Sequence, residues 1–125
     1  MKSILITGAT RGIGLALARF YADKGCCLTL NGGHDKDALA AVEKELSKKT
    51  RVISCFGSVA EEKTAITMTQ KAMDTFGQID LLINNAGILL PFDKSYNYSE
   101  EAVEKCMNTN FSSCRYAINS MLPVL

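Results

Sequence analysis

Short, continuous apolar runs alternate along this chain with longer segments in which apolar residues recur every three or four positions. Apolar runs without polar interruption are typical of strands buried on both faces of a parallel sheet, and apolar residues at helical spacing are typical of helices that cover such a sheet. The pattern predicts strands at 4–6, 27–31, 51–55 and 80–84, and helices at 13–24, 36–48, 60–76 and 99–122. Because a helix follows each strand, we expect an α/β fold with parallel strands and right-handed crossovers.

Each predicted helix has an apolar face, with Leu39, Val42 and Leu46 on the second helix and Ala65, Met68, Ala72 and Phe76 on the third. In the first helix, Ile13, Leu17 and Phe20 fall on one face, with Ala16 beside them. In the last helix, one face places an asparagine among apolar and small residues: Val103, Cys106, Asn110, Cys114, Ala117 and Met121. An asparagine on such a face must find hydrogen-bond partners, or it destabilises the helix. A loop that contains Pro91 is expected before this helix.

Length and composition are those of a single globular domain over residues 1–125. Hydrophobic residues make up 47% and charged residues 22%, and the formal net charge is +1. A balance so close to neutral favours neither nucleic acid nor an anionic membrane as a partner. No apolar run approaches the roughly 20 residues of a membrane span. The segment after Lys2 is too short for a signal peptide.

The five cysteines indicate a reducing compartment. Their number is odd, they lack C-x-x-C spacing, and Cys26 and Cys27 are adjacent. We therefore expect reduced core thiols and a cytoplasmic protein. A single histidine without paired cysteine ligands predicts no metal site.

Three glycines separate the first predicted strand from the first helix. Gly8, Gly12 and Gly14 follow the strand with the spacing G-x-x-x-G-x-G. Residues without a Cβ let the backbone approach a pyrophosphate closely, and the helix that follows offers unpaired N–H groups and the positive end of its dipole. The spacing differs from the usual G-x-G-x-x-G fingerprint, and no Gly-Lys-Ser/Thr follows as in a P-loop. The turn predicts a phosphate site, with a glycine-rich helix-packing turn as the plainer alternative.

Two motifs together resemble the short-chain dehydrogenase/reductase family: TGATRGIG at 7–14 and NNAG at 84–87. The resemblance spans the whole chain but only the N-terminal half of a typical member, so a fold incomplete at the C-terminus is expected. It implies a Rossmann-type, doubly wound parallel sheet in the order 3-2-1-4, a nicotinamide dinucleotide, and hydride transfer to or from a carbonyl or alcohol. In that order strands 1 and 4 meet at the topological switch point, where ligands bind.

The same resemblance implies an open sheet edge and contacts between subunits. Without a fifth strand, the fourth strand would expose an apolar edge. The last helix normally packs against another subunit in this family. We therefore expect self-association, as in a homo-oligomer, or pairing with a second polypeptide, or instability.

The resemblance assigns a cofactor site residue by residue. The backbone of 12–14 would face the pyrophosphate, and 85–87 would pass beside the riboses. Ser58 and Val59 would contact the adenine, while Asn84 is expected to tie neighbouring backbone together. The implied cofactor residues are Gly8, Thr10, Arg11, Gly12, Ile13, Gly14, Gly33, Ser58, Val59, Asn85, Ala86 and Gly87.

The end of the second strand bears on the choice between the two nicotinamide dinucleotides. An acidic residue there binds the ribose 2′-OH of NAD, but the position falls on Gly32. Arg11 can meet a 2′-phosphate instead, although it can also be a solvated charge at a turn. NADP is therefore favoured, and NAD stays possible because Gly33 stands where many NADP-using relatives carry a basic residue. His34 is expected to be a plain loop residue.

The resemblance implies only part of a catalytic apparatus. The segment 108–111 resembles the family's helix with a catalytic-site asparagine, which implies that Asn110 holds a helix distortion and a water of the proton relay. Family members also use a serine and a Tyr-x-x-x-Lys pair, but no tyrosine of this chain has a lysine four positions later. Acid–base proton transfer is typically worth about 10²–10⁴-fold in rate. We therefore expect this chain alone to bind a dinucleotide without turning over substrate.

Two other classes of function stay open at this point. One is a non-catalytic dinucleotide-binding or dimerisation module, which needs no Tyr-x-x-x-Lys pair. The other is an S-adenosylmethionine-dependent methyltransferase, which usually has an acidic residue at the end of the second strand. Gly32 argues against the methyltransferase.

Overall fold

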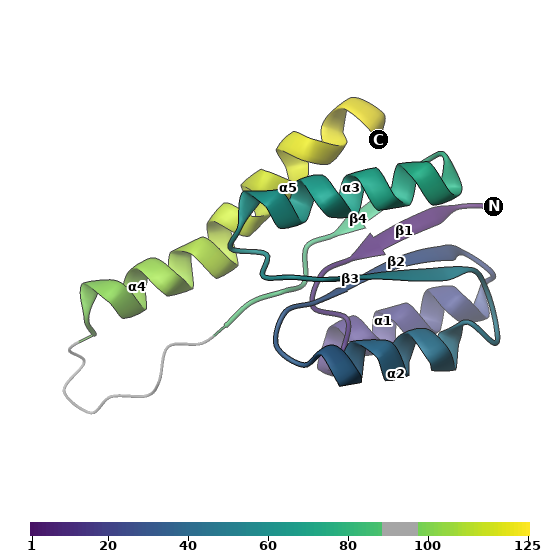
Figure 1. The fold of residues 1–125 in the computed structure, drawn as a ribbon, viewed down its shortest axis with the longest axis horizontal. Coiled ribbons are helices and arrows are strands. Elements are labelled where there is room, and N and C mark those ends of the chain that lie inside the picture. Colours follow the sequence, from purple (N-terminus) through teal and green to yellow (C-terminus); the bar gives the residue numbers. More distant parts are fainter. Residues whose placement is uncertain (89–97) are drawn as a thin grey trace.

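The computed structural model describes residues 1–88 and 98–125, and the predicted loop around Pro91 lies outside them. Strands and helices alternate as the sequence predicts (Figure 1). In chain order the elements are β1 (Ser3–Ile6), α1 (Gly12–Asp23), β2 (Cys27–Gly32), α2 (Lys36–Leu46), β3 (Val52–Phe56), α3 (Glu62–Phe76), β4 (Leu81–Ile83), α4 (Glu100–Met107), the π-helical turn η1 (Asn108–Ser112), α5 (Ser113–Met121) and the short 3₁₀ turn η2 (Leu122–Val124). Every helix in the described part of the chain is too short or too polar to cross a bilayer.

The four strands form one parallel sheet in the order β3-β2-β1-β4. This order confirms the doubly wound sheet that the resemblance implies. In the register of the sheet, Leu5 of β1 lies beside Thr29 of β2 on one side and Leu82 of β4 on the other. The chain runs from β1 outward to β3 and then returns to the other side of β1, so the topological switch point lies between β1 and β4.

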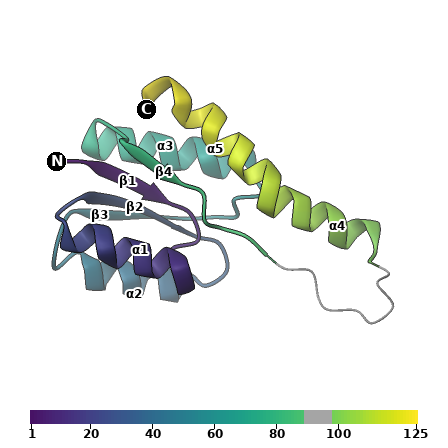
Figure 2. The same cartoon turned by 180° about the vertical axis from the view of Figure 1, so that it is seen from behind.

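Helices cover both faces of the sheet. α1 and α2 lie side by side on one face, and α3 and α5 cover the other (Figures 1 and 2). Ile4 and Leu28 belong to the core under α1 and α2, whereas Leu5 packs with Met68 of α3 and Met121 of α5. Neighbouring side chains of β1 thus enter opposite cores, as the period of two along a strand requires.

Local signals in the sequence account for several helix ends. Asp35 Oδ1 accepts the N–H of Ala38 at 2.9 Å where α2 begins, and Ser99 Oγ accepts the N–H of Ala102 at 3.1 Å where α4 begins. Such N-caps contribute about 1 kcal/mol each. α3 ends at Gly77, whose φ of 75° lies in the left-handed region that glycine adopts without strain.

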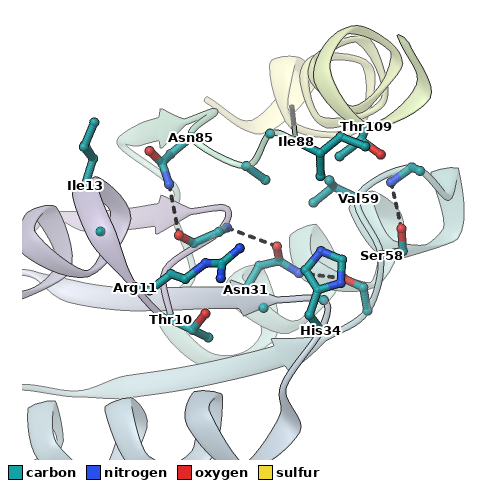
Figure 3. A pocket seen from close by; sticks show the side chains of 18 of the residues that line it. Thr10, Arg11, Ile13, Asn31, His34, Ser58, Val59, Asn85, Ile88 and Thr109 are labelled. Atoms are coloured by element: carbon teal, nitrogen blue, oxygen red, sulfur yellow. Dashed lines mark hydrogen bonds between the residues drawn. The ribbon is translucent and has the colours of Figure 1, made fainter. Parts of the chain in front are cut away.

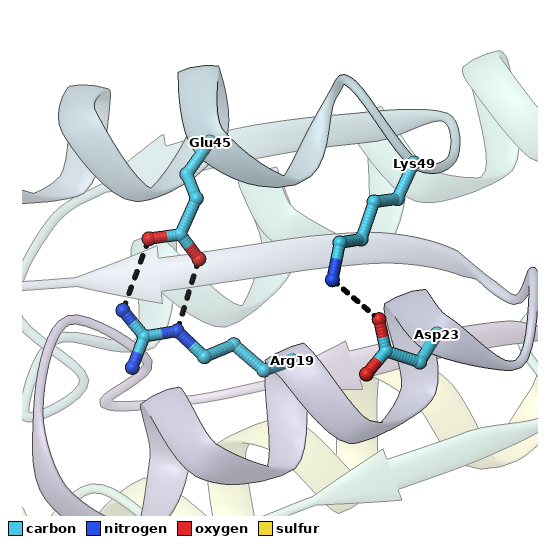
Figure 4. A network of polar contacts seen from close by, with 4 residues as sticks. All are labelled: Arg19, Asp23, Glu45 and Lys49. Atoms are coloured by element: carbon cyan, nitrogen blue, oxygen red, sulfur yellow. Dashed lines mark hydrogen bonds and ion pairs between the residues drawn. The ribbon is translucent and has the colours of Figure 1, made fainter.

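Two ion pairs join α1 to α2 and to the residues just after it (Figure 4). Arg19 donates to both carboxylate oxygens of Glu45 at 2.9 and 3.0 Å, and Lys49 Nζ lies 2.5 Å from Asp23 Oδ1. The hydrogen bond from Arg19 holds the pKa of Glu45 below its ordinary value. All four side chains are exposed, and water screens such pairs, so the buried core and not these bridges holds the two helices together.

The predicted apolar face of α1 is wrong. Ile13 is 73% exposed and Phe20 51% exposed, and Leu17 packs against the core only in part. The buried face of α1 consists of small residues: Gly14, Ala18 and Ala22. Small side chains allow the helix axis to approach the sheet closely, and that close approach leaves the larger residues on the sides of the helix.

The predicted helix at 99–122 is interrupted by the π turn at Asn108–Ser112. A π turn holds more residues than an α turn, so it shifts α4 in rotation relative to α5. The single predicted face is therefore wrong in α4 and right only in part in α5, where Cys114 is only half-buried. Val103 is 45% exposed, whereas Ala117 and Met121 are buried.

Candidate functional site

A cavity of about 350 Å³ opens at the carboxyl ends of the strands (Figure 3). Its walls come from the glycine turn after β1, the ends of β2 and β3, the segment after β4, and residues of α4 and the π turn. Every predicted cofactor residue except Gly14 lines it: Gly8, Thr10, Arg11, Gly12, Ile13, Gly33, Ser58, Val59, Asn85, Ala86 and Gly87. The fold thus gathers segments that are far apart in the sequence around one hollow.

The glycine turn fits tightly against the segment that follows β4. A Cβ at Gly8, where φ is +65°, would lie 2.9 Å from the Cα of Ala86. A Cβ at Gly14 would overlap the carbonyl oxygen of Gly8 and lie 2.5 Å from Nδ2 of Asn85. Gly14 therefore lies beneath the turn and shapes the wall of the cavity without lining it.

Thr7 and Asn85 clamp the ends of β1 and β4 together. Thr7 Oγ1 accepts the backbone N–H groups of Asn85 and Ala86, each at 3.0 Å. Asn85 Nδ2 donates to the carbonyl oxygens of Thr7 and Gly8 at 3.2 and 2.9 Å. The backbone tie predicted for Asn84 is therefore made by Asn85, while Asn84 is exposed. Thr7 stands in the first motif, but its role was not predicted.

Asn31 makes a second clamp, between β1, β2 and β3, and was not predicted either. Its buried side chain accepts the N–H of Gly8 at 3.3 Å and donates to the carbonyl oxygens of Cys55 and Gly57 at 3.2 and 3.0 Å. Burial also raises the pKa of the Cys55 thiol, so this cysteine stays uncharged beside the clamp. A polar residue at the end of an otherwise apolar strand was the signal in the sequence.

The end of β2 carries no carboxylate toward the cavity. A Cβ at Gly32 would lie 2.7 Å from Cγ2 of Thr10, so the backbone packs closely against the glycine turn. Arg11 and His34 line the cavity here (Figure 3), and both also line a smaller hollow beside the start of α2. Asp35 borders only the smaller hollow. His34, expected from the sequence to be a plain loop residue, is thus part of the cavity wall.

The charged side chains that line the cavity within the described residues are cationic. Arg11 comes from the glycine turn and Lys105 from α4, and His34 adds a polar ring. Carboxylates are absent from this described lining. Histidines, cysteines and carboxylates form no metal-binding cluster within residues 1–88 and 98–125. The cavity therefore suits an elongated anionic ligand such as a nucleotide with its phosphates.

Asn110 lies on the π turn and holds the segment after β4 without lining the cavity. Its Oδ1 accepts the N–H of Ile88 at 2.7 Å and its Nδ2 donates to the carbonyl oxygen of Ile88 at 2.7 Å. Nδ2 also lies 3.2 Å from Sγ of Cys106, one turn earlier. A Cβ at Gly87 would lie 3.2 Å from Oδ1 of Asn110, so this segment passes close to the π turn. π turns are often found at functional sites.

Comparison with known proteins gives a consistent result. The sequence model of the short chain dehydrogenase family matches residues 2–125. An uncharacterized oxidoreductase of Thermotoga maritima is 36% identical over 124 residues, which are 96% of this chain and 48% of that protein. The L-rhamnose 1-dehydrogenase (NAD(P)(+)) of Sphingomonas sp. strain SKA58 is 32% identical over 120 residues, which are 95% of this chain and 47% of that protein. The chain therefore spans about half the length of these curated relatives.

A solved structure extends the likeness to three dimensions. The alcohol dehydrogenase of the archaeon Thermococcus sibiricus, complexed with 5-hydroxy-NADP, matches with a TM-score of 0.91 and 29% sequence identity. The match covers 100% of this chain and 53% of that one.

Proposed function

This chain belongs to the short-chain dehydrogenase family, and from that premise we propose that it supplies the cofactor half of an oxidoreductase that transfers hydride between NADP(H) and a carbonyl or alcohol substrate. The observation that carries the proposal is the cavity at the switch point, with the glycine turn on one side and the Thr7–Asn85 clamp on the other. Crevices at this place in doubly wound sheets hold dinucleotides.

The residues around the cavity fit a dinucleotide. The turn places no Cβ at Gly8 or Gly12, and α1 begins with Gly12 and Ile13, which line the cavity, without a side-chain cap from Arg11. The N–H groups of this first turn would hold the pyrophosphate. The segment 85–87 would lie beside the riboses, and Ser58 and Val59 beside the base. When bound, the nicotinamide ring supplies or accepts the hydride.

Arg11 and His34 support a preference for NADP. Both line the cavity where β2 ends, and Gly32 presents no carboxylate that would repel a 2′-phosphate. A guanidinium fork suits phosphate oxygens geometrically. NAD stays a possible cofactor, because the name of the Sphingomonas relative, L-rhamnose 1-dehydrogenase (NAD(P)(+)), includes both dinucleotides.

Asn110 is the only residue of the proposed catalytic apparatus that these 125 residues supply. Its contacts with Ile88 make it a positioning residue for the segment that passes the nicotinamide side of the cavity. No Tyr-x-x-x-Lys pair is present in the sequence. We therefore propose that this chain binds the dinucleotide but does not turn over substrate without an acid–base group from elsewhere. A non-catalytic dinucleotide-binding module is the second candidate, because the cavity by itself supports binding.

Exposed apolar side chains support self-association. Phe111 is 61% exposed on the π turn, and further large apolar residues are exposed on α4, α5, η2 and the residue after it: Val103, Met107, Ile118, Leu122 and Leu125. A second copy of the chain would cover part of this surface. Free thiols at all five cysteines agree with a cytoplasmic location. Sedimentation velocity tests the assembly, and a well-folded monomer at micromolar concentration would contradict it.

Isothermal titration calorimetry of the chain with NADPH and NADH tests the cofactor assignment. We expect both to bind at one site and NADPH to bind more tightly. A stable chain that binds neither nucleotide would overturn the proposed function, and tighter binding of NADH would overturn the NADP preference. Adenosine 2′,5′-bisphosphate serves as a control, because it carries the adenosine half of NADP with its 2′-phosphate but no nicotinamide. It should compete with NADPH.

A further inference from the structure

The last residue of β2 is a glycine, although its backbone conformation does not require one. Gly32 is buried, lines the cavity and pairs with Phe56 in the register of the sheet. It is not among the glycines with a positive φ. Residues of any type adopt such a strand conformation. The backbone therefore permits a side chain at this position, and what restricts it is the space into which a Cβ would point.

The methyl group of Thr10 fills that space. A Cβ at Gly32 would lie 2.7 Å from Cγ2 of Thr10, whereas carbon atoms in van der Waals contact are about 3.5–4.0 Å apart. Two carbons of Leu39, at 3.5 Å from the same Cβ, make only ordinary contacts. Thr10 is therefore the residue that leaves too little room for a side chain at position 32.

Hydrogen bonds hold both backbones in place around this contact. The N–H of Ala9, next to Thr10 in the glycine turn, donates to the carbonyl oxygen of Asn31 at 2.8 Å. The carbonyl oxygen of Gly32 accepts the N–H of Gly57 at 3.0 Å on the side of β3. Because the turn is tied to β2 and β2 is tied to β3, relief of an overlap falls to the side chain of Thr10. That side chain is β-branched and has few χ1 rotamers.

Position 32 bears on the choice of cofactor, because an acidic residue at the end of the second strand binds the ribose 2′-OH of NAD. The same charge repels a 2′-phosphate. We infer that Thr10 sets the cofactor preference through its contact with Gly32, by keeping this position free of a side chain and so keeping a carboxylate away from the 2′ oxygen. The inference rests on the proposed dinucleotide function. Thr10 and Gly32 together form one specificity determinant.

Urea unfolding tests the contact without any nucleotide. G32A adds the Cβ alone, T10S removes the methyl group and keeps the hydroxyl, and T10V keeps a methyl group in the same place. G32A should lower the unfolding midpoint in the wild-type and T10V backgrounds but not in the T10S background. An equal effect of G32A in all three backgrounds would show that the methyl group does not restrict position 32, and the inference would be wrong.

Calorimetric titration with NADPH and NADH tests the consequence for the cofactor. G32D alone should weaken the binding of both, because Thr10 and the turn must move to admit the side chain. T10S/G32D should bind NADH at least about tenfold more tightly than NADPH, which is the low end for a hydrogen bond to a charged group. T10V/G32D should behave like G32D. T10S/G32N is the matched control without the charge, and it should lack the reversal.

The outcomes separate this inference from the function on which it rests. If G32D alone binds NADH more tightly than NADPH, or if T10S/G32D does not, the role of Thr10 is wrong while the dinucleotide site stands. If the folded wild-type chain binds neither nucleotide, the proposed function fails and this inference fails with it. Circular dichroism establishes that each variant is folded before its affinities are compared.

Discussion

Replacing Thr7 with valine removes one oxygen from the junction between β1 and β4 while keeping the volume of the side chain. Thr7 is 3% exposed, and its Oγ1 accepts the N–H groups of Asn85 and Ala86. Valine can accept neither. The variant therefore tests whether this hydroxyl holds the wall of the cavity in place.

The expected loss of stability depends on which hydrogen-bond partners the two N–H groups keep in the variant. The N–H of Asn85 also donates to the carbonyl oxygen of Ile83 at 3.1 Å, so it keeps a partner. The N–H of Ala86 keeps no backbone partner among the described hydrogen bonds. One unsatisfied, partly buried group and one weakened bond predict a loss of about 2–3 kcal/mol in the free energy of unfolding.

Urea unfolding measures the loss as a lower midpoint at an unchanged m-value. T7S is the matched control, because it keeps the oxygen and loses one methyl group, at a cost of about 1 kcal/mol. T7V should also weaken NADPH binding, and T7S should not. If T7V is as stable as wild type, or more stable than T7S, the hydroxyl does not hold this junction.

Three further changes test separate parts of the account. R11A should weaken NADPH binding about tenfold and NADH binding little, because the guanidinium is assigned to the 2′-phosphate; an equal loss for both nucleotides in calorimetry would contradict that assignment. G14A should lower the free energy of unfolding by about 3 kcal/mol or more, because its Cβ would overlap a carbonyl oxygen of the turn. G25A should lower it by only about 1–2 kcal/mol, because Gly25 has a positive φ with open space around it. Similar unfolding midpoints for the two variants would show that the turn is not tightly packed. The N–H of Ser3, 2.7 Å from Asp80 Oδ2, lowers the pKa of Asp80. This carboxylate therefore stabilises the fold above its unfolded pKa of about 3.9, and the contribution is lost as the pH falls through the lower folded value. D80N should be less stable than wild type near neutral pH and lose less stability on acidification; parallel acid-unfolding curves would refute this.

Much of the architecture follows from the sequence because its strands are short and apolar on both faces. Continuous apolar runs separated by helical segments allow few arrangements other than a parallel sheet with crossovers. The face of α1 could not be predicted from hydrophobicity, because close packing on the sheet selects small residues such as Ala18 over larger ones such as Phe20. The π turn could not be predicted from periodicity either, since a single extra residue leaves the apolar spacing on both sides intact.

The candidate site was predictable where it depends on glycines and was missed where it depends on tertiary contacts. Gly8 and Gly12 predict a turn whose backbone a ligand can approach closely. The roles of Thr7 and Asn31 depend on partners many residues away, which only the folded chain identifies. Lys105 belongs to the lining of the cavity, and nothing in its local sequence indicates a ligand-binding role.

Backbone NMR of the ¹⁵N-labelled chain during titration with NADPH tests the central claim most directly. The account predicts that the largest shifts of the amide signals fall at 8–14 and 85–88, the two segments that meet at the switch point. Shifts concentrated on α5, or no shifts at saturating nucleotide, would contradict it.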